Sequence, residues 1–351
     1  MTNDELYMRR CLQLAELGAG HTAPNPMVGA VMVHEGIIIG EGYHKQYGGP
    51  HAEVNCINSV AGENKHLIPS STIYVSLEPC AHHGKTPPCA DLIIQNRIPK
   101  VVVGCRDPFP AVNGKGIEKL QYAGVQVTLG VLENECRSLN KRFFTFHTLH
   151  RPYILLKWAQ TSDNKIASLS ADRLFITSEI TNKLVHKWRS EEAAILVGTN
   201  TARLDDPSLT NRLWPGNSPV RLVVDMHLNL PQHLRVFDAT QRTIIFNSIK
   251  HEETGNTTYY QVTEDVSIVH QIRNACYQYN IQSIMVEGGA KLLQSFIDEG
   301  MWDEAHVITN TQLFIGEGLA APPLTNFKLY KQEDIFSDSI NYFYNTAFGF
   351  K

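Results

Sequence analysis

Three side chains that bind transition metals, those of His51, Cys80 and Cys89, lie within forty residues of one another in the sequence. Zinc in a catalytic centre takes three protein ligands and keeps a fourth position open for water, and it prefers imidazole and thiolate ligands. His51 opens one predicted helix, while Cys80 and Cys89 flank a segment that runs into another. Two helix N-termini can therefore meet at one ion and favour ionised thiolates. The pattern indicates a catalytic zinc site.

A carboxylate accompanies these ligands, because Glu53 follows His51 by two residues. A bound metal ion lowers the pKa of water, so a carboxylate beside it can take a proton and return it to a departing nitrogen. The pattern H-x-E with P-C-x-x-C is typical of zinc nucleobase deaminases. Here eight residues rather than two separate the cysteines. We predict hydrolytic removal of an amino group from a heterocycle, with Glu53 as the catalytic proton carrier.

Two other interpretations of the cysteines remain open, namely a closed structural zinc site and buried cysteines without metal. A structural site normally has four ligands, and only His82 or His83 could supply the fourth here. The chain has seven cysteines, an odd number spread over its length, which is not typical of a disulfide framework. We expect free thiols, with Cys105 and Cys276 as packing residues.

Helices and strands alternate around the predicted zinc site. The expected elements are a helix at 4–18, a hairpin at 28–44, helices at 52–60, 87–98 and 114–124, and strands at 71–78, 100–105 and 125–130. Short crossovers between such elements predict a three-layer α/β/α domain whose sheet is largely parallel in one half.

A second domain is expected, because 351 residues exceed the usual size of one domain. The alternation breaks at residues 143–153, and Pro152 precedes a new apolar strand. We predict domains at 1–148 and 149–351. Strand-like runs in the second domain lie at 193–198, 220–225, 242–247, 281–289 and 304–309, with helical runs at 181–192 and 289–300.

Composition limits the partners of the protein. The formal net charge is −4 and the basic residues are scattered, which argues against nucleic acid as a partner. No stretch has the pattern of a signal peptide or the length of a membrane span. We expect a cytoplasmic protein that acts on a small molecule, without nucleic acid or membrane, and leave open whether it forms a homo-oligomer.

Four stretches in the first domain resemble one family closely: "PNPMVGAVMV", "GEGYH", "GGPHAE" and "LEPCAHHGKTPPCADLI". They are similar to the deaminase domain of the bifunctional riboflavin biosynthesis proteins. Three later stretches, "LKWAQTSDNKIA", "WRSEEAAILVGTNTARLDDPSLTNR" and "VEGGAKL", resemble the reductase domain of that family. The resemblance implies a cytidine-deaminase-like domain followed by a dihydrofolate-reductase-like α/β domain.

The resemblance also implies a pair of reactions. Zinc-dependent deamination of 2,5-diamino-6-ribosylamino-4(3H)-pyrimidinone 5′-phosphate would precede reduction of its ribosyl group by NADPH. The rival interpretation is a nucleoside or tRNA deaminase with a C-terminal binding module. The long spacing between the cysteines and the net negative charge argue against this alternative.

Individual roles follow from the resemblance. It implies that His51, Cys80 and Cys89 bind zinc, that Glu53 carries the proton, and that the deaminase substrate contacts Asn25, His44, His82, Lys85 and Thr86. The implied contacts of the reductase substrate are Lys157, Arg173, Arg189, Leu209, Arg212 and Glu287. The implied NADPH contacts are Ala159, Ile166, Phe175, Thr201, Asp205, Gly288, Gly289 and Ala290.

Without the resemblance, the residue types support some of these roles more strongly than others. Asn25 before Pro26 could be a turn residue, and a lone arginine is usually solvated. No G-x-G-x-x-G occurs, but "VEGGAKL" places glycines at a helix start, where backbone N–H groups can bind a pyrophosphate. The family often shows G-x-S-x-W-I-T where this chain has "ADRLFIT", so Arg173 and Phe175 replace a serine and a tryptophan.

Overall fold

The computed structural model describes residues 2–81, 87–169 and 174–347. The predicted contacts His82, Lys85, Thr86 and Arg173 lie outside the described residues. The chain divides into two compact units, Met1–His150 and Arg151–Lys351. None of the helices in the described part of the chain is both long and apolar enough to cross a membrane.

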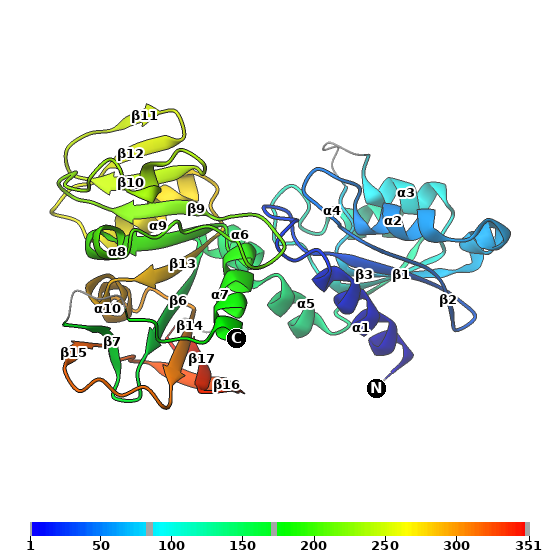
Figure 1. Cartoon of the computed structure of the whole chain (residues 1–351). Coiled ribbons are helices and arrows are strands. Elements are labelled where there is room, and N and C mark those ends of the chain that lie inside the picture. The colour runs from blue at the N-terminus through cyan, green and yellow to red at the C-terminus, as the bar shows by residue number, and fades with distance from the viewer. Residues whose placement is uncertain (1, 82–86, 170–173, 348–351) are drawn as a thin grey trace. The chain divides into compact units, whose positions relative to one another are not determined.

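The first unit is built on a sheet that has five strands within the described residues, in the order β2-β1-β3-β4-β5 (Figure 1). β1 pairs antiparallel with β2 and β3, whereas β3, β4 and β5 are parallel. The sheet is therefore parallel in one half, as predicted. The strands are β1 (Gly29–His34), β2 (Ile37–Tyr43), β3 (Thr72–Leu77), β4 (Lys100–Cys105) and β5 (Gln126–Leu129).

Helices cover both faces of this sheet (Figure 1). One buried cluster joins α2 (Ala52–Ser59), α3 (Cys89–Gln95) and α4 (Lys115–Tyr122) to the sheet. A second cluster joins α1 (Asn3–Glu16), α5 (Glu133–Leu139) and α6 (Lys141–Leu149) to the other face. A 3-10 segment, Gly62–Ser70, precedes β3. The three-layer α/β/α prediction is confirmed.

Helices α5 and α6 were not predicted; α6 was missed because the stretch at 143–153 was interpreted only as a break between domains. The helix α6 buries Phe143, Phe144 and Phe146. Burial of these aromatic side chains stabilises a short helix that has little propensity of its own.

The second unit contains a sheet that has ten strands within the described residues, in the order β11-β12-β10-β9-β8-β13-β6-β14-β17-β16. Its seven central strands are parallel, and β11, β17 and β16 are antiparallel to their neighbours. The central strands are β6 (Tyr153–Gln160), β8 (Ala194–Gly198), β9 (Val220–Val224), β10 (Thr243–Asn247), β12 (Thr257–Gln261), β13 (Ser283–Gly288) and β14 (Glu304–Asn310). The other three are β11 (Glu252–Thr254), β16 (Phe327–Ile335) and β17 (Asp338–Asn345).

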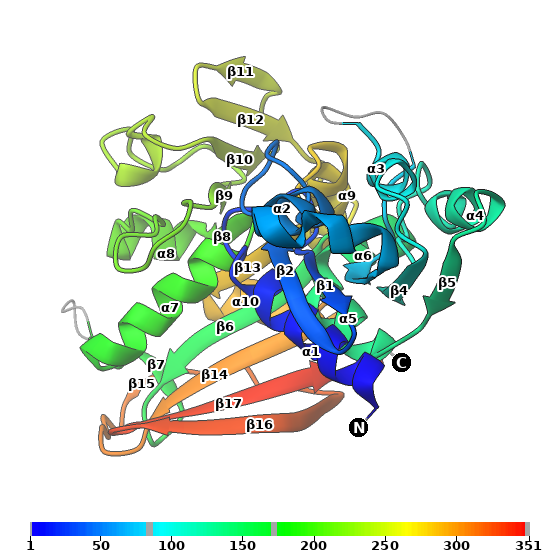
Figure 2. The same cartoon turned by 90° about the vertical axis from the view of Figure 1, so that its right-hand side faces the viewer.

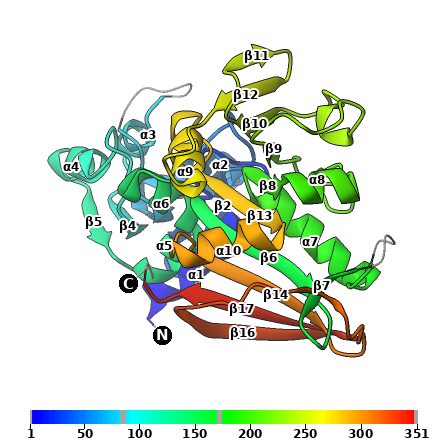
Figure 3. The same cartoon turned by 90° about the vertical axis from the view of Figure 1, so that its left-hand side faces the viewer.

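Helices also cover both faces of the second sheet. One face, seen in Figure 2, carries α7 (Glu179–Glu191) and α8 (Thr199–Asp205). The other, seen in Figure 3, carries α9 (Ile268–Gln278) and α10 (Ala290–Asp298). A small separate sheet pairs β7 (Lys165–Ser168) with β15 (Gly318–Ala320), and a 3-10 turn spans Arg235–Phe237. Ligands of open α/β sheets bind beyond the carboxyl ends of the parallel strands. Among the predicted site residues, Cys80 follows β3, Thr201 follows β8, and Glu287 lies near the end of β13.

Candidate active sites

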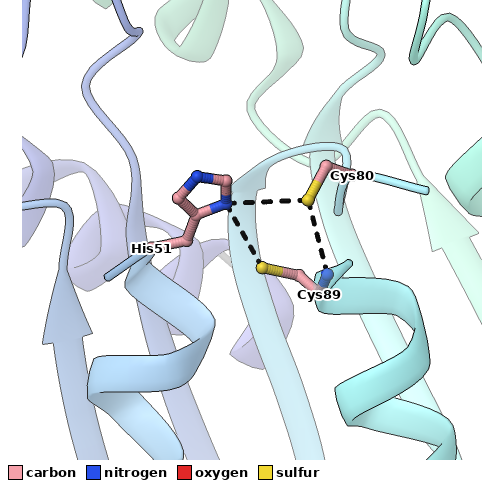
Figure 4. A group of neighbouring side chains, drawn as sticks. All are labelled: His51, Cys80 and Cys89. Carbon is pink, nitrogen blue, oxygen red and sulfur yellow. Dashed lines mark hydrogen bonds between the residues drawn. The ribbon is translucent and has the colours of Figure 1, made fainter. Parts of the chain in front are cut away.

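The three predicted zinc ligands meet at the N-terminal ends of two helices (Figure 4). His51 is the N-cap of α2, Cys89 is the first residue of α3, and Cys80 lies in the turn after β3. The Nδ1 atom of His51 lies 3.4 Å from Sγ of Cys89 and 3.6 Å from Sγ of Cys80. Tetrahedral zinc, with bonds of about 2.0–2.3 Å, holds such atoms roughly 3.5–3.8 Å apart. The donor set therefore fits zinc in kind and spacing.

Cys80 and Cys89 lie close enough to affect each other's ionisation. The Cys80 sulfur accepts a hydrogen bond from the backbone N–H of Cys89 at 3.3 Å. The Cys89 thiol and the His51 ring also stabilise the thiolate, and together they lower the pKa of Cys80 to about 4. The pKa of Cys89 is raised, because its thiol shares its proton with Cys80 and is buried. The surroundings of Cys80 therefore favour its thiolate, which is the form that binds a metal.

The predicted proton carrier lies beside these ligands. Glu53 stands in the first turn of α2, and its side chain is buried. Burial raises the pKa of the Glu53 carboxyl, while the neighbouring charge of His51 opposes the shift. A carboxyl whose pKa moves toward neutrality is suited to accepting and returning a proton.

Two of the predicted substrate contacts of the deaminase lie next to His51. The Nδ1 atom of His44 donates to the carbonyl of Pro50 at 3.0 Å, since that oxygen can only accept. The Nε2 atom of His44 then accepts from the Asn25 amide at 3.1 Å. Burial lowers the pKa of His44, so the ring is neutral, and its centroid lies 5.5 Å from that of His51. The structure thus brings Asn25 and His44 to the metal-binding group.

One residue of this region was missed by the sequence analysis. The buried carboxylate of Glu78, two residues before Cys80, accepts four backbone hydrogen bonds. The donors and distances are Gly114 (2.9 Å), Gly116 (2.9 Å), Asp107 (3.3 Å) and Ile117 (3.3 Å). The signal in the sequence was an acidic residue directly after an apolar strand and before the "PC" pair. Glu78 ties the turn that carries Cys80 to the segment 107–117.

A buried ion cluster forms the centre of the second candidate site. Glu287, near the carboxyl end of β13, accepts from Lys157 Nζ at 3.2 Å and from Arg189 Nη2 at 2.5 Å. Burial opposes ionisation of Glu287, but the charges of Arg189 and Lys157 outweigh it and lower the pKa to about 2. Three predicted substrate contacts therefore share one charged cluster.

Predicted NADPH contacts gather at the ends of β8 and β13. A methyl group added to Gly288 would lie 2.8 Å from the Thr201 side chain, so these residues are in close contact. Gly289 has a φ of +82°, a conformation that glycine adopts without strain, and it leads into α10 at Ala290. This turn allows the backbone to approach a ligand closely.

The remaining predicted reductase residues are more dispersed. Leu209 is only 2% exposed, and its side chain packs in the core. The Phe175 side chain is 77% exposed. Ala159 and Ile166 pack against opposite core clusters, and Asp205 ends α8. Arg212 is exposed, and its Nη1 donates to Oγ1 of Thr210 at 2.9 Å.

Comparison with known proteins places both halves in one family. Residues 1–105 match the "Cytidine and deoxycytidylate deaminase zinc-binding region" model, and residues 152–333 match the "RibD C-terminal domain" model. The riboflavin biosynthesis protein RibD of Aquifex aeolicus is 42% identical over 90% of this chain and 89% of its own length. The chain belongs to the RibD family.

Other members of the RibD family also match this chain over most of its length. RibD of Escherichia coli is 36% identical over 86% of each chain. The crystal structure of a Thermotoga maritima protein, described as a diaminohydroxyphosphoribosylaminopyrimidine deaminase/5-amino-6-(5-phosphoribosylamino)uracil reductase, is 38% identical. It matches with a TM-score of 0.87 over 98% of this chain and 99% of its own. The chain is thus a bifunctional enzyme of riboflavin biosynthesis, with a zinc-binding deaminase domain and an NADPH-dependent reductase domain.

Proposed function

We propose that this RibD protein deaminates 2,5-diamino-6-ribosylamino-4(3H)-pyrimidinone 5′-phosphate and then reduces the ribosyl group to give 5-amino-6-ribitylaminouracil 5′-phosphate. The description of the Thermotoga maritima relative names this pair of activities. The observation that carries the proposal is the convergence of His51, Cys80 and Cys89 beside buried Glu53, on one chain with the reductase domain. We assign residues 1–148 to the deaminase and 149–351 to the reductase.

In the first reaction His51, Cys80 and Cys89 would hold zinc, which would lower the pKa of a water toward neutrality. Glu53 would take a proton from that water, whose oxygen bonds to the ring carbon, and would return the proton to the amino group, which leaves as ammonia when its C–N bond breaks. His44 stays neutral because burial of its ring lowers its pKa, although the hydrogen bond from Nδ1 to the Pro50 carbonyl opposes this shift. The Asn25 amide, bonded to His44, is thereby oriented toward the substrate ring.

In the second reaction NADPH would supply a hydride to C1′ of the ribosyl group, the C1′–O4′ bond of the ring would break, and O4′ would take a proton from water. Glu287 is held as a carboxylate and can accept hydrogen bonds from sugar hydroxyls. Lys157 and Arg189, both paired with Glu287, offer donors to the same hydroxyls and to the phosphate. Arg212 provides a second guanidinium for the phosphate, and Thr201, Gly288, Gly289 and Ala290 form the turn against which the cofactor phosphates would lie.

A coupled assay tests the sequence of reactions. Purified protein given the phosphorylated diaminopyrimidine is expected to release ammonia, and to oxidise NADPH only after deamination or when given the deaminated intermediate. Cytidine and an RNA stem-loop serve as control substrates. Ammonia release from either control at a comparable rate would favour the rival nucleoside or tRNA deaminase, and oxidation of NADH alone would overturn the reductase assignment.

Replacing Cys89 with serine is expected to remove zinc and deamination together while NADPH oxidation continues. Serine is a poor zinc ligand, and a catalytic site with two remaining protein ligands binds the ion weakly. Cys56→Ser is the matched control, because Cys56 is also buried in this domain but is not among the candidate ligands. Elemental analysis should find about one zinc ion per chain in the wild type and the control. Full zinc occupancy in Cys89→Ser would contradict the ligand assignment.

We further propose a cytoplasmic enzyme whose partners are its phosphorylated pyrimidine substrate and copies of itself. All seven cysteines lie within the described residues and are free thiols, which suits a reducing compartment. The outer strand β16 leaves Phe327 and Leu329 47% and 46% exposed, which supports self-association along this edge.

A further inference from the structure

The segment 206–212, which follows α8, holds two of the predicted substrate contacts in an irregular backbone. Leu209 has a φ of +52°, a left-handed conformation that costs energy for a branched side chain. The fully buried Arg221 donates from Nε to the carbonyl of Ser208 at 2.9 Å. The path of this segment is therefore set by side chains outside it.

Two residues of α7, one helical turn apart, hold the end of the same segment. Arg189 donates from Nη1 to the carbonyl of Thr210 at 3.3 Å. His186 accepts the backbone N–H of Arg212 on Nδ1 at 3.0 Å. The exposed side chain of Arg212 is therefore attached to a backbone that α7 holds in place.

The surroundings of His186 suit it to this task. The side chain is 1% exposed, and because Nδ1 accepts a hydrogen bond, the ring proton must lie on Nε2. Burial and the charges of Arg189 and Arg212 lower the pKa of His186 to about 4. The imidazole is therefore neutral at neutral pH, and its acceptor remains available to Arg212.

We propose that His186 is a positioning residue of the reductase, which fixes the backbone of Arg212 so that its guanidinium meets the substrate phosphate. The proposal rests on the proposed function, because it takes Arg212 as a phosphate contact. His186 itself touches neither the sugar nor the cofactor in this role. Its contribution is to the affinity for phosphorylated substrate, exerted through Arg212.

Two substitutions separate the hydrogen bond from the packing. In His186→Phe the ring remains but the acceptor is lost, which leaves a buried N–H without its partner. In His186→Asn the side-chain oxygen can take the place of Nδ1. We expect His186→Phe to raise KM for the deaminated, phosphorylated substrate about tenfold, with kcat and KM for NADPH within about twofold. His186→Asn should stay within about threefold of wild type in all three constants.

A double-mutant cycle shows whether His186 acts through Arg212. Arg212→Met should raise KM for the substrate by itself, and adding His186→Phe should then change it little, because coupled residues are not additive. The preference for phosphorylated over dephosphorylated substrate should fall in both single variants. Additive effects, or equal losses of kcat in His186→Phe and His186→Asn, would show a packing role only and would overturn the proposal.

Amide hydrogen exchange provides a readout that needs no activity. The peptide containing Arg212 should exchange faster in His186→Phe than in wild type, and at the wild-type rate in His186→Asn. Unchanged exchange in His186→Phe would overturn the hydrogen-bond role. A wild-type protein that fails to oxidise NADPH with the deaminated substrate would instead overturn the proposed function, and the exchange measurement would still decide whether His186 holds the backbone of Arg212.

Discussion

Glu53→Gln is expected to lower the rate of deamination by roughly 10³-fold, within the range for loss of a general acid–base group. Glutamine has nearly the same shape as glutamate but cannot take a proton from water or return it to the leaving amine. Zinc content should not change, because Glu53 is not among the candidate ligands. The melting temperature should not fall, since burying a neutral amide costs less than burying a carboxylate.

The measurements for Glu53→Gln are ammonia release, zinc content and NADPH oxidation on one preparation. NADPH oxidation with the deaminated substrate reports on the other domain and should be unchanged. Glu63→Gln is the matched control, because Glu63 is exposed in the same domain. Deamination at more than a tenth of the wild-type rate in Glu53→Gln would exclude the proton-carrier role.

The second large effect is expected for Glu287→Gln, which should abolish NADPH oxidation and destabilise the reductase domain. The side chains of Lys157 and Arg189 are only 13% and 14% exposed, and both are paired with Glu287. A neutral amide would leave two largely buried cations without a counter-charge, a change that typically costs about 3–5 kcal/mol. The amide N–H groups of the new glutamine would also point toward the N–H donors of Lys157 and Arg189, with which they cannot form hydrogen bonds. Thermal unfolding and NADPH oxidation measure these losses, and ammonia release should continue.

Lowering the pH should narrow the difference in melting temperature between Glu287→Gln and wild type. The pKa of Glu287 is lowered from 4.5 to about 2 on folding, so its stabilisation is complete above about pH 4.5 and is lost as the pH falls toward 2. The variant lacks this titration. Glu252→Gln is the control, because Glu252 forms an exposed pair with Lys250 in the same domain. A constant difference in melting temperature from pH 7 to pH 3 would contradict the assigned charge state.

The deaminase site was more predictable from sequence than the reductase site for a physical reason. Zinc requires particular donor atoms, and His51, Cys80 and Cys89 stand next to helix starts, so residue type and spacing predicted the cluster that the structure shows. The charged cluster of Glu287, Lys157 and Arg189 joins residues from three distant elements. No local pattern in the residues indicates that they meet, and only the family resemblance brought them together.

The elements that were missed also have physical explanations. The strand β16 is largely exposed and rich in charge, so neither an apolar run nor clean alternation indicates a strand. Its pairing with β17 supplies the stability that its own sequence lacks. Leu209 was predicted to contact substrate from its place in a motif, and the structure adds that its side chain packs in the core. Any contact with substrate would then come from its backbone.

The hydrogen bonds that four backbone N–H groups donate to Glu78 affect how this enzyme can acquire zinc. They anchor the turn before Cys80 without any help from a metal. Small zinc-finger domains, in contrast, are unfolded until they are loaded. The deaminase domain should therefore stay folded when zinc is removed, and it should regain full activity when zinc is added back. The supply of zinc would then determine how active this protein is, but not whether it is folded.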